Sequence, residues 1–509
     1  MKAQTVKDYL AVHTWVGILC GLVLYVAFYA GAFSMLQAEI TRWTQPPAPA
    51  SRAVSGDADQ LVKAFWDAEP HATGRVRLIW PGVDNAQPVL VHLVRGKEAV
   101  AWQLGIDGQL HRMDGMPRED STSGKFVDYL HRKGGLPLPL DVAEPIIGLV
   151  ALAYALALVS GVVVVLPSLA KDLFHLRLGA NLKRMWLDVH NLLGVASLPF
   201  HLVIALSAAV FGLHDVVYMA QDRFIYPAGL GPTVARDSVP RPTVNRADWL
   251  PPSEIKRRVQ QQAAGFRPLA LDYVIQPQGT SAFVSGSDER HFQRASRYGL
   301  AIVDLSSGEI HDRSYLPGAS GAVSTALLGS LFSLHFGSYG GDTVRVLYLL
   351  LGFSGALLFY TGNLLWIETR TQRARVPQEA AVRERPRHVR IVSALTLGVC
   401  LGCAAALPAT LVLARWLGPW LVDLNGLHQG AYYALFGGCI AWAIWRGTER
   451  AAPGLLWCAA SCNALVPLAV ALRPGADGAL LGATCTALAL FFAWQAWRLR
   501  PSPPGAAQR

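Results

Sequence analysis

Five of the 14 histidines in this chain lie within or beside long apolar segments. An ionisable side chain is costly there and is usually functional, as a metal ligand, a proton relay or a substrate contact. The five are His13, His131, His190, His201 and His335. For a single histidine the alternative is a neutral ring bonded to a neighbouring helix backbone, but a repeated pattern weakens that alternative.

His190 and His201 are 11 residues apart in one apolar segment. On a continuous helix they would differ by about 20° around the axis and lie about 16 Å apart along it. We therefore expect them to face the same side at two depths of a membrane, which suits two metal centres stacked across it.

Glycine follows two of these histidines by four residues, as Gly17 after His13 and Gly194 after His190. Residues four apart share a helix face, so each glycine leaves room for a flat macrocycle beside the imidazole. The same spacing also permits close helix packing. With two histidines at matched depth on separate helices, a haem with two histidine ligands is the simplest occupant.

The second pair of ligands is less sharply defined. The symmetry of the repeat would pair His131 with His335. Depth in the membrane favours His201 with His335, and we prefer this pair. His131 is then a substitute ligand or a substrate contact. Arg345 could contact a haem propionate or simply extend to the membrane interface. Zinc is disfavoured because it needs four clustered ligands, and no carboxylate or thiol recurs beside these histidines.

The composition indicates a membrane protein, since 52% of the residues are hydrophobic and only 16% are charged. Apolar runs long enough to cross a bilayer predict about eight transmembrane helices, four in a duplicated core and four in a C-terminal extension. They lie near 10–36, 142–166, 187–212, 343–367, 391–415, 427–446, 454–472 and 477–497. The net charge of +10 sits mostly in short segments between these runs, so it indicates topology and does not imply nucleic acid.

The basic segments 167–186 and 368–390 and the chain end are predicted to be cytoplasmic. Both termini are then inside, and two long segments face the periplasm after Pro-rich or polar linkers near 46–49 and 240–242. The predicted divisions are helix 1 (1–36), a first α+β lobe (37–141), helices 2 and 3 (142–212), a second lobe (213–341), helix 4 (342–368), a basic linker (369–390) and the C-terminal extension (391–498).

An internal repeat underlies this organisation. The stretches 100–110 and 300–310 both have the pattern of a strand, an Asp/Gly turn and a second strand, which predicts a hairpin in each lobe. The unit of histidine, helix, lobe, histidine and helix occurs twice, and the second helix of each unit ends in Ser160-Gly161 or Thr361-Gly362. Cys400-x-x-Cys403 lies in an apolar run without a nearby histidine, so helix packing explains it better than redox or metal chemistry.

These motifs resemble the PepSY-associated transmembrane-helix family over about residues 1–370. The matching stretches are His13-Thr-Trp-Val-Gly17, Trp186-Leu-Asp188-Val-His190, Leu198-Pro199-Phe200-His201, Leu334-His335-Phe-Gly337 and Tyr360-Thr361-Gly362. The resemblance implies four core helices, two periplasmic PepSY lobes and, in one branch of ferric-siderophore reductases, two b-type haems. It assigns the ligand role to His13, His190, His201 and His335.

The resulting expectation is a dihaem ferric-siderophore reductase of a bacterial inner membrane. It would pass electrons outward to Fe(III) held by a siderophore or another chelate, because the haems carry the chemistry and the protein places them. No nucleotide-binding motif occurs, so a quinol or a cytoplasmic reductase must be the donor. A haemless scaffold or regulator that binds a periplasmic partner is the alternative, and a permease is weakened by the scarcity of acidic residues within most spans.

Overall fold

The structure is a computed structural model of the chain, and every structural statement below refers to the residues that it describes. These residues are 3–44, 57–81, 87–94, 100–105, 107–113, 122–167, 181–225, 245–277, 279–288, 299–313, 316–317, 323–374, 386–421, 423–472 and 478–499. The predicted linkers at 46–49 and 240–242, and most of the two basic segments, lie outside them.

The chain divides into two compact units, which we describe separately. The membrane unit comprises Met1–Pro46, Glu119–Leu213 and Val346–Arg509, and the sheet unit comprises Pro47–Arg118 and His214–Arg345. Seven helices within the described ranges are long and apolar enough to cross a membrane. The protein is therefore a multi-pass membrane protein.

The first part of the membrane unit is built from long helices that follow the predicted apolar runs. They are α1 (Ala3–Ser34), α5 (Leu140–Val165), α7 (Leu182–Ala196), α8 (Leu198–Phe224) and α12 (Gly341–Ala374). Two short helices, α2 (Gln37–Thr44) and α4 (Ser123–Arg132), pack against this group. Gly148 of α5 and Gly212 of α8 allow a close crossing, because a Cβ added at Gly212 would lie 2.6 Å from the Cα of Gly148.

The segment predicted as one helix over 187–212 is two helices. α7 ends at Ala196, Ser197 leaves the helical conformation with φ −102° and ψ 11°, and α8 starts at Leu198. Pro199 has no N–H to continue the hydrogen-bond ladder of α7, which accounts for a break at this point. His190 and His201 therefore lie on different helices, and the straight-helix estimate of their separation does not apply.

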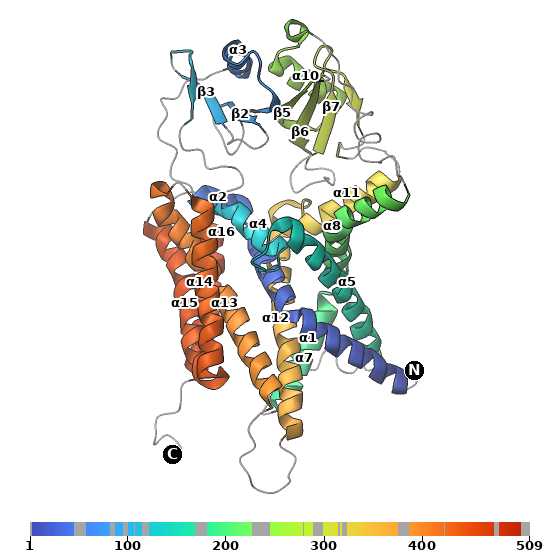
Figure 1. Ribbon diagram of the computed structural model, residues 1–509, viewed down its shortest axis with the longest axis vertical. Helices are drawn as coiled ribbons and strands as arrows, with labels where there is room; N and C mark the ends of the chain where they lie inside the picture. The colour runs from blue at the N-terminus through green and yellow to red at the C-terminus, as the bar shows by residue number, and fades with distance from the viewer. Residues whose placement is uncertain are drawn as a thin grey trace. The chain divides into compact units, whose positions relative to one another are not determined.

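The C-terminal extension forms four helices, as predicted. They are α13 (Arg387–Leu417), α14 (Leu424–Arg446), α15 (Thr448–Leu472) and α16 (Ala479–Arg498), and they lie side by side in Figure 1. Three of them qualify as candidate spans, whereas α14 does not. The polar side chains of Asn425, His428 and Gln429 in its first turns lower its hydropathy.

Small residues hold this bundle together. Added Cβ atoms at Gly398 and Gly402 of α13 would lie 2.7 Å from the Cα of Ile440 and 3.1 Å from the Cβ of Cys439 in α14. Cys400 and Cys403 are buried free cysteines on the same helix. This packing agrees with the interpretation of the C-x-x-C stretch as a helix contact.

Polar contacts join the extension to the first part of the membrane unit. The imidazole Nε2 of His428 is hydrogen-bonded to Ser123 Oγ of α4 at 2.9 Å, and its ring is stacked on Phe126. Tyr433 donates to the carbonyl of Leu136 at 3.1 Å, and Arg415 donates to the carbonyl of Trp43.

The sheet unit contains one eight-stranded antiparallel sheet in the order β4-β3-β2-β1-β5-β6-β7-β8. The strands are β1 (Gly74–Ile79), β2 (Val89–Leu93), β3 (Val100–Leu104), β4 (Leu110–Arg112), β5 (Arg267–Gln276), β6 (Gly279–Ser287), β7 (Gly299–Val303) and β8 (Ile310–Asp312). Helices α3 (Ala58–Ala68) and α10 (Pro252–Gln262) share one apolar core with the strands (Figure 1). The turn η2 (Arg246–Asp248) and helix α11 (Val323–Phe336) complete the unit.

The two predicted lobes are thus halves of one sheet, joined where β1 pairs with β5. Asp272 of β5 is 1% exposed at this join and accepts hydrogen bonds from Arg75 Nε at 2.7 Å and Nη2 at 2.9 Å. Arg77 lies opposite Asp272 in the register, with its Nε 3.4 Å from the carboxylate. A buried carboxylate needs such partners, and a shifted register would remove them.

The hairpins predicted at 100–110 and 300–310 are present as β3–β4 and β7–β8. Their turns contain Gly108 with φ +69° and Gly308 with φ +67°, a conformation that favours glycine. The element order within each half, a helix followed by four strands and then a helix that carries His131 or His335, agrees with the predicted repeat.

We predict that replacing Asp304, in the β7–β8 turn, by alanine destabilises the sheet in a pH-dependent way. Burial would raise the pKa of Asp304, but hydrogen bonds from Ser306 and Ser307 outweigh burial and lower the pKa to about 2. A carboxylate with a lowered pKa stabilises the fold above its unfolded pKa of about 4, and that contribution disappears as the pH falls towards 2.

The loss at pH 7 should be about 1–2 kcal/mol, measured by hydrogen exchange in β7 and β8 of the detergent-solubilised chain. Glu309→Ala removes an exposed carboxylate from the same turn and should leave exchange unchanged. Equal destabilisation by Asp304→Ala at pH 7 and pH 2 would contradict the assignment.

Candidate functional site

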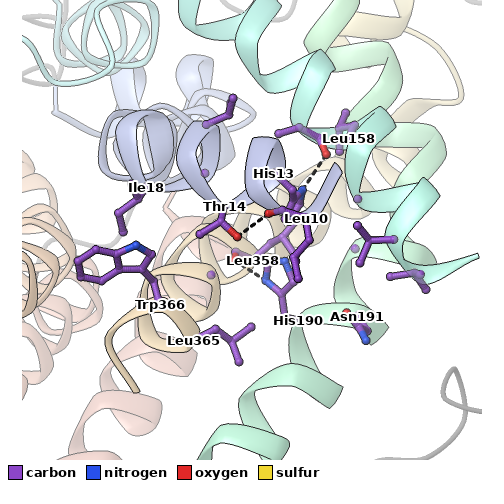
Figure 2. A pocket seen from close by; sticks show the side chains of 18 of the residues that line it. Leu10, His13, Thr14, Ile18, Leu158, His190, Asn191, Leu358, Leu365 and Trp366 are labelled. Carbon is purple, nitrogen blue, oxygen red and sulfur yellow. Dashed lines mark hydrogen bonds between the residues drawn. The ribbon is translucent and has the colours of Figure 1, made fainter. Parts of the chain in front are cut away.

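His13 of α1 and His190 of α7 face each other inside the membrane unit. Their ring centroids are 6.1 Å apart and the ring planes are inclined by 75°. Figure 2 shows both imidazoles directed into one cavity. The structure therefore brings together the two histidines that the sequence paired.

Hydrogen bonds fix which nitrogen of each ring carries the proton. His13 Nδ1 lies 2.8 Å from the carbonyl oxygen of Ala157 in α5. His190 Nδ1 lies 3.1 Å from the carbonyl oxygen of Leu358 in α12 and 3.1 Å from Thr361 Oγ1. A carbonyl can only accept, so Nδ1 donates in both rings and Nε2 keeps the lone pair that binds a metal.

A glycine on the facing helix supports each of these rings. A Cβ added at Gly161 would lie 3.0 Å from His13 Cε1, and one added at Gly362 would lie 3.3 Å from His190 Cε1. Each glycine is four residues after the carbonyl that its histidine bonds, so carbonyl and glycine lie on the same helix face. A side chain at either position would crowd the imidazole, more tightly at Gly161 than at Gly362.

The cavity beside the two rings has a volume of about 690 Å³, within the usual range for small-molecule and cofactor sites. Gly17 and Gly194, singled out from the sequence, both line it. A Cβ at Gly17 would meet nothing within 4 Å, and one at Gly194 would meet only Leu358 Cδ1, at 3.5 Å. The space beside both histidines is thus open.

These features fit an iron porphyrin held by two histidines. An imidazole nitrogen binds a first-row metal at about 2 Å and the ring centroid lies about 1 Å further away, so two axial imidazoles have centroids about 6 Å apart. The measured 6.1 Å agrees with that value. Within the described residues, no cluster of three or more His, Cys, Asp or Glu side chains could hold a metal ion.

His131 of α4 is seated in the same way at a second level. Its Nδ1 lies 2.8 Å from the carbonyl of Ala27 in α1, and a Cβ added at Gly31 would lie 2.8 Å from that same nitrogen. Gly31 is again four residues after the carbonyl. Ala27 is 14 residues beyond His13 on α1, which places this level about 21 Å along the helix from the first.

His201 of α8 is fully buried among aromatic rings. Its centroid lies 5.6 Å from Phe28, 6.1 Å from Tyr154 and 5.6 Å from Phe200, and its Cε1 is 3.1 Å from a Cβ built at Gly355. Neither ring nitrogen has a hydrogen-bond partner among the described groups. An imidazole without partners in an apolar environment is energetically costly, so His201 is suited to bind a group that supplies a partner.

His335 and Arg345 belong to the sheet unit by the division of the chain. His335 is near the end of α11 with its ring 5.3 Å from Phe336, and Arg345 Nε lies 3.5 Å from Asp342 on α12. The predicted pairing of His201 or His131 with His335 stays a prediction.

The sequence interpretation missed the glycines that support the rings, which are Gly31, Gly161, Gly355 and Gly362. The repeated Ser160-Gly161 and Thr361-Gly362 doublets were noticed as marks of the repeat but not as seats for imidazoles. Thr361 Oγ1 also donates to the carbonyl of Leu358, at 2.9 Å. The doublets could have indicated this role because each lies within a helix, α5 or α12, whose glycine faces a histidine.

Comparison with known families agrees with these observations. The family model of the PepSY-associated TM region matches residues 10–369, which is well over half of the chain. The chain belongs to the PepSY-associated transmembrane family. No curated protein matches it. In this PepSY-associated protein, α13–α16 lie beyond the matched residues.

We predict that Gly161→Ala weakens binding of hemin to the His13/His190 site by about tenfold or more, as substitutions that disturb the support of a metal ligand do. The added methyl would force the His13 ring away from its carbonyl. Gly437→Ala is the control, because a Cβ there meets nothing within 4 Å. Binding is measured by titrating the apo-protein in detergent with hemin and following visible absorbance. Equal affinities for the two variants would contradict the role of Gly161 in supporting the His13 ring.

Proposed function

We propose that this protein is an inner-membrane dihaem reductase that passes electrons across the membrane to a ferric siderophore or a similar Fe(III) chelate. The observation that carries the proposal is the His13/His190 pair, with its 6.1 Å ring separation and both Nδ1 atoms bonded to helix carbonyls. Haem at such a site supplies reversible one-electron transfer. Membership of the family supports a membrane protein but does not define the substrate.

At the first level, His13 and His190 would hold the haem iron through Nε2, and the haem would supply one-electron transfer. The carbonyls of Ala157 and Leu358 keep each ring in the correct tautomer and orientation, and such hydrogen bonds raise ligand basicity. The cavity is lined mainly by apolar side chains, and such surroundings affect the reduction potential of a bound haem.

The second level is proposed from His201, with His335 as its partner. His201 supports this because both of its nitrogens are buried without partners. His131 remains the alternative ligand, because its bond to Ala27 and its seat on Gly31 repeat the arrangement of the first level. Ala27, whose carbonyl bonds His131, is about 21 Å from the His13 level along α1, whereas Gly355, which lies against His201, is about 10 Å from Gly362 along α12.

The proposed orientation places the sheet unit in the periplasm and the chain ends in the cytoplasm. Three helices end in a tryptophan followed four residues later by an arginine that lies over its ring, which suits a membrane interface with cationic residues on the cytoplasmic side. The pairs are Trp366/Arg370 at 3.8 Å, Trp442/Arg446 at 5.6 Å and Trp494/Arg498 at 4.9 Å.

In the proposed reaction one electron reduces chelated Fe(III) to Fe(II), which the chelator holds far more weakly, so the metal is released. The electron comes from a quinol or a cytoplasmic reductase and enters near His13 and His190. No side chain needs to act as an acid, base or nucleophile. The protein binds and orients the redox groups and separates the donor from the acceptor.

A reduced-minus-oxidised visible spectrum of the detergent-purified protein, with a pyridine haemochrome count, tests the proposal. We expect two haems per chain in the wild type and one after His13→Ala or His190→Ala, because a single axial ligand holds b-type haem weakly. His111→Ala, which removes an exposed histidine of the sheet, should keep both. His201→Ala and His131→Ala then identify the ligand at the second level.

A wild-type protein without a Soret band would contradict the proposal. The alternative is a haemless scaffold that binds a periplasmic partner, and it predicts that His13→Ala and His190→Ala leave iron-dependent growth unchanged.

A further inference from the structure

Three cations from three different helices line the cavity beside His13 and His190. They are Lys7 of α1, Lys183 of α7 and Arg370 of α12, and we call them the basic mouth. Among the described residues that line the cavity there is no aspartate or glutamate. The site is therefore apolar with an excess of positive charge.

The basic mouth lies at one end of the cavity. Lys7 is six residues before His13, and Lys183 is seven residues before His190, so the cations are about 9 Å and 10 Å from the histidine level along their helices. Arg370 is eight residues after Gly362, the seat of His190, which is about 12 Å along α12. Figure 1 shows α7 beginning near the end of α12, so the offsets of Lys183 and Arg370 point to the same end of the cavity, whereas the first turns of α1, which carry Lys7, run to one side.

The cations are supported to different degrees. Arg370 is positioned by Trp366, since its guanidinium carbon lies 3.8 Å from the ring centroid and the tryptophan itself lines the cavity (Figure 2). Lys183 is half-buried in the first turn of α7, which Asn181 caps by accepting from Arg184 N. Lys7 is exposed. Arg370 and Lys183 are thus held near the cavity and Lys7 can reach into it.

We propose that the basic mouth binds the carboxylate arms of the macrocycle that His13 and His190 hold. This inference rests on the proposed function. The chemistry that fits is a flat apolar body with anionic groups on one edge, because the apolar walls accept the body and the three cations accept the charges. The acidic edge of the cofactor would then face the end of the cavity where α7 begins, which the proposed topology places at the cytoplasmic surface.

Two porphyrins that differ only in their carboxylates separate this inference from a general role in folding. Apo-protein is titrated with hemin and with hemin dimethyl ester, whose esters cannot pair with a cation. Lys183→Gln and Arg370→Gln should each weaken hemin binding about three- to tenfold, as expected for loss of a charge-assisted contact. The same variants should bind the dimethyl ester as the wild type does.

Two further variants control for position and shape. Arg184→Gln removes the exposed cation next to Lys183 that does not line the cavity, and it should bind hemin normally. Arg370→Lys keeps the charge and should recover most of the affinity that Arg370→Gln loses. A second readout is the reduction potential of the bound haem, which should fall in Lys183→Gln and Arg370→Gln because a nearby cation favours the ferrous state.

If the variants weaken both porphyrins equally, or weaken neither, the carboxylate role is wrong even though the haem site stands. If the wild type binds neither hemin nor its ester, the proposed function itself fails.

Discussion

An imidazole buried between membrane helices must have its N–H satisfied, because lipid offers no hydrogen-bond partner. This protein meets that requirement with helix carbonyls. A carbonyl that already accepts a helical hydrogen bond has a second lone pair, and a glycine four residues later lets the ring approach it. His13, His190 and His131 all use this arrangement, on Ala157/Gly161, Leu358/Gly362 and Ala27/Gly31. The same bonds leave Nε2 as the nitrogen with a lone pair.

The C-terminal extension, α13–α16, lies outside the residues that match the family and packs against two of the helices that carry these histidines. Its contacts are with α1, α2 and α4, and the buried His428–Ser123 bond reaches the helix that carries His131. A bond between two buried polar groups strongly favours a single packing arrangement, because breaking it leaves both unsatisfied. The extension thereby braces α4, two turns before His131, against α14.

Much of this could be predicted from residue patterns. The apolar runs located the long helices, because hydrocarbon thickness dictates a minimum length, but α1, α8 and α12 extend seven to twelve residues beyond the predicted runs. The pairing of His13 with His190 followed from matched depth and matched glycines. The prediction of one continuous helix over 187–212 was wrong. Pro199 interrupts the hydrogen-bond ladder there but does not change the hydropathy of the segment.

Two features lay beyond sequence reasoning for the same reason. The support of the two imidazoles by Gly161 and Gly362 depends on α5 packing beside α1 and on α12 packing beside α7. The join of the two half-sheets depends on the pairing of β1 with β5, which are far apart in the chain. Residue patterns within a short segment predict its helix or strand, whereas contacts between segments far apart in the chain depend on tertiary packing. The hairpins at Gly108 and Gly308 were accessible because a turn residue and its two strands are neighbours in the chain.

The join between β1 and β5 also constrains the order of biogenesis. Arg77 and its partner Asp272 are separated by nearly 200 residues, which include the whole of α5, α7 and α8. At the usual elongation rate, β1 would wait for about 10–40 s before β5 is synthesised. Until then β1 has an open backbone edge, which is the kind of surface that mispairs. The charged side chains of Arg75 and Arg77 sit on that waiting edge and discourage association with other apolar strands.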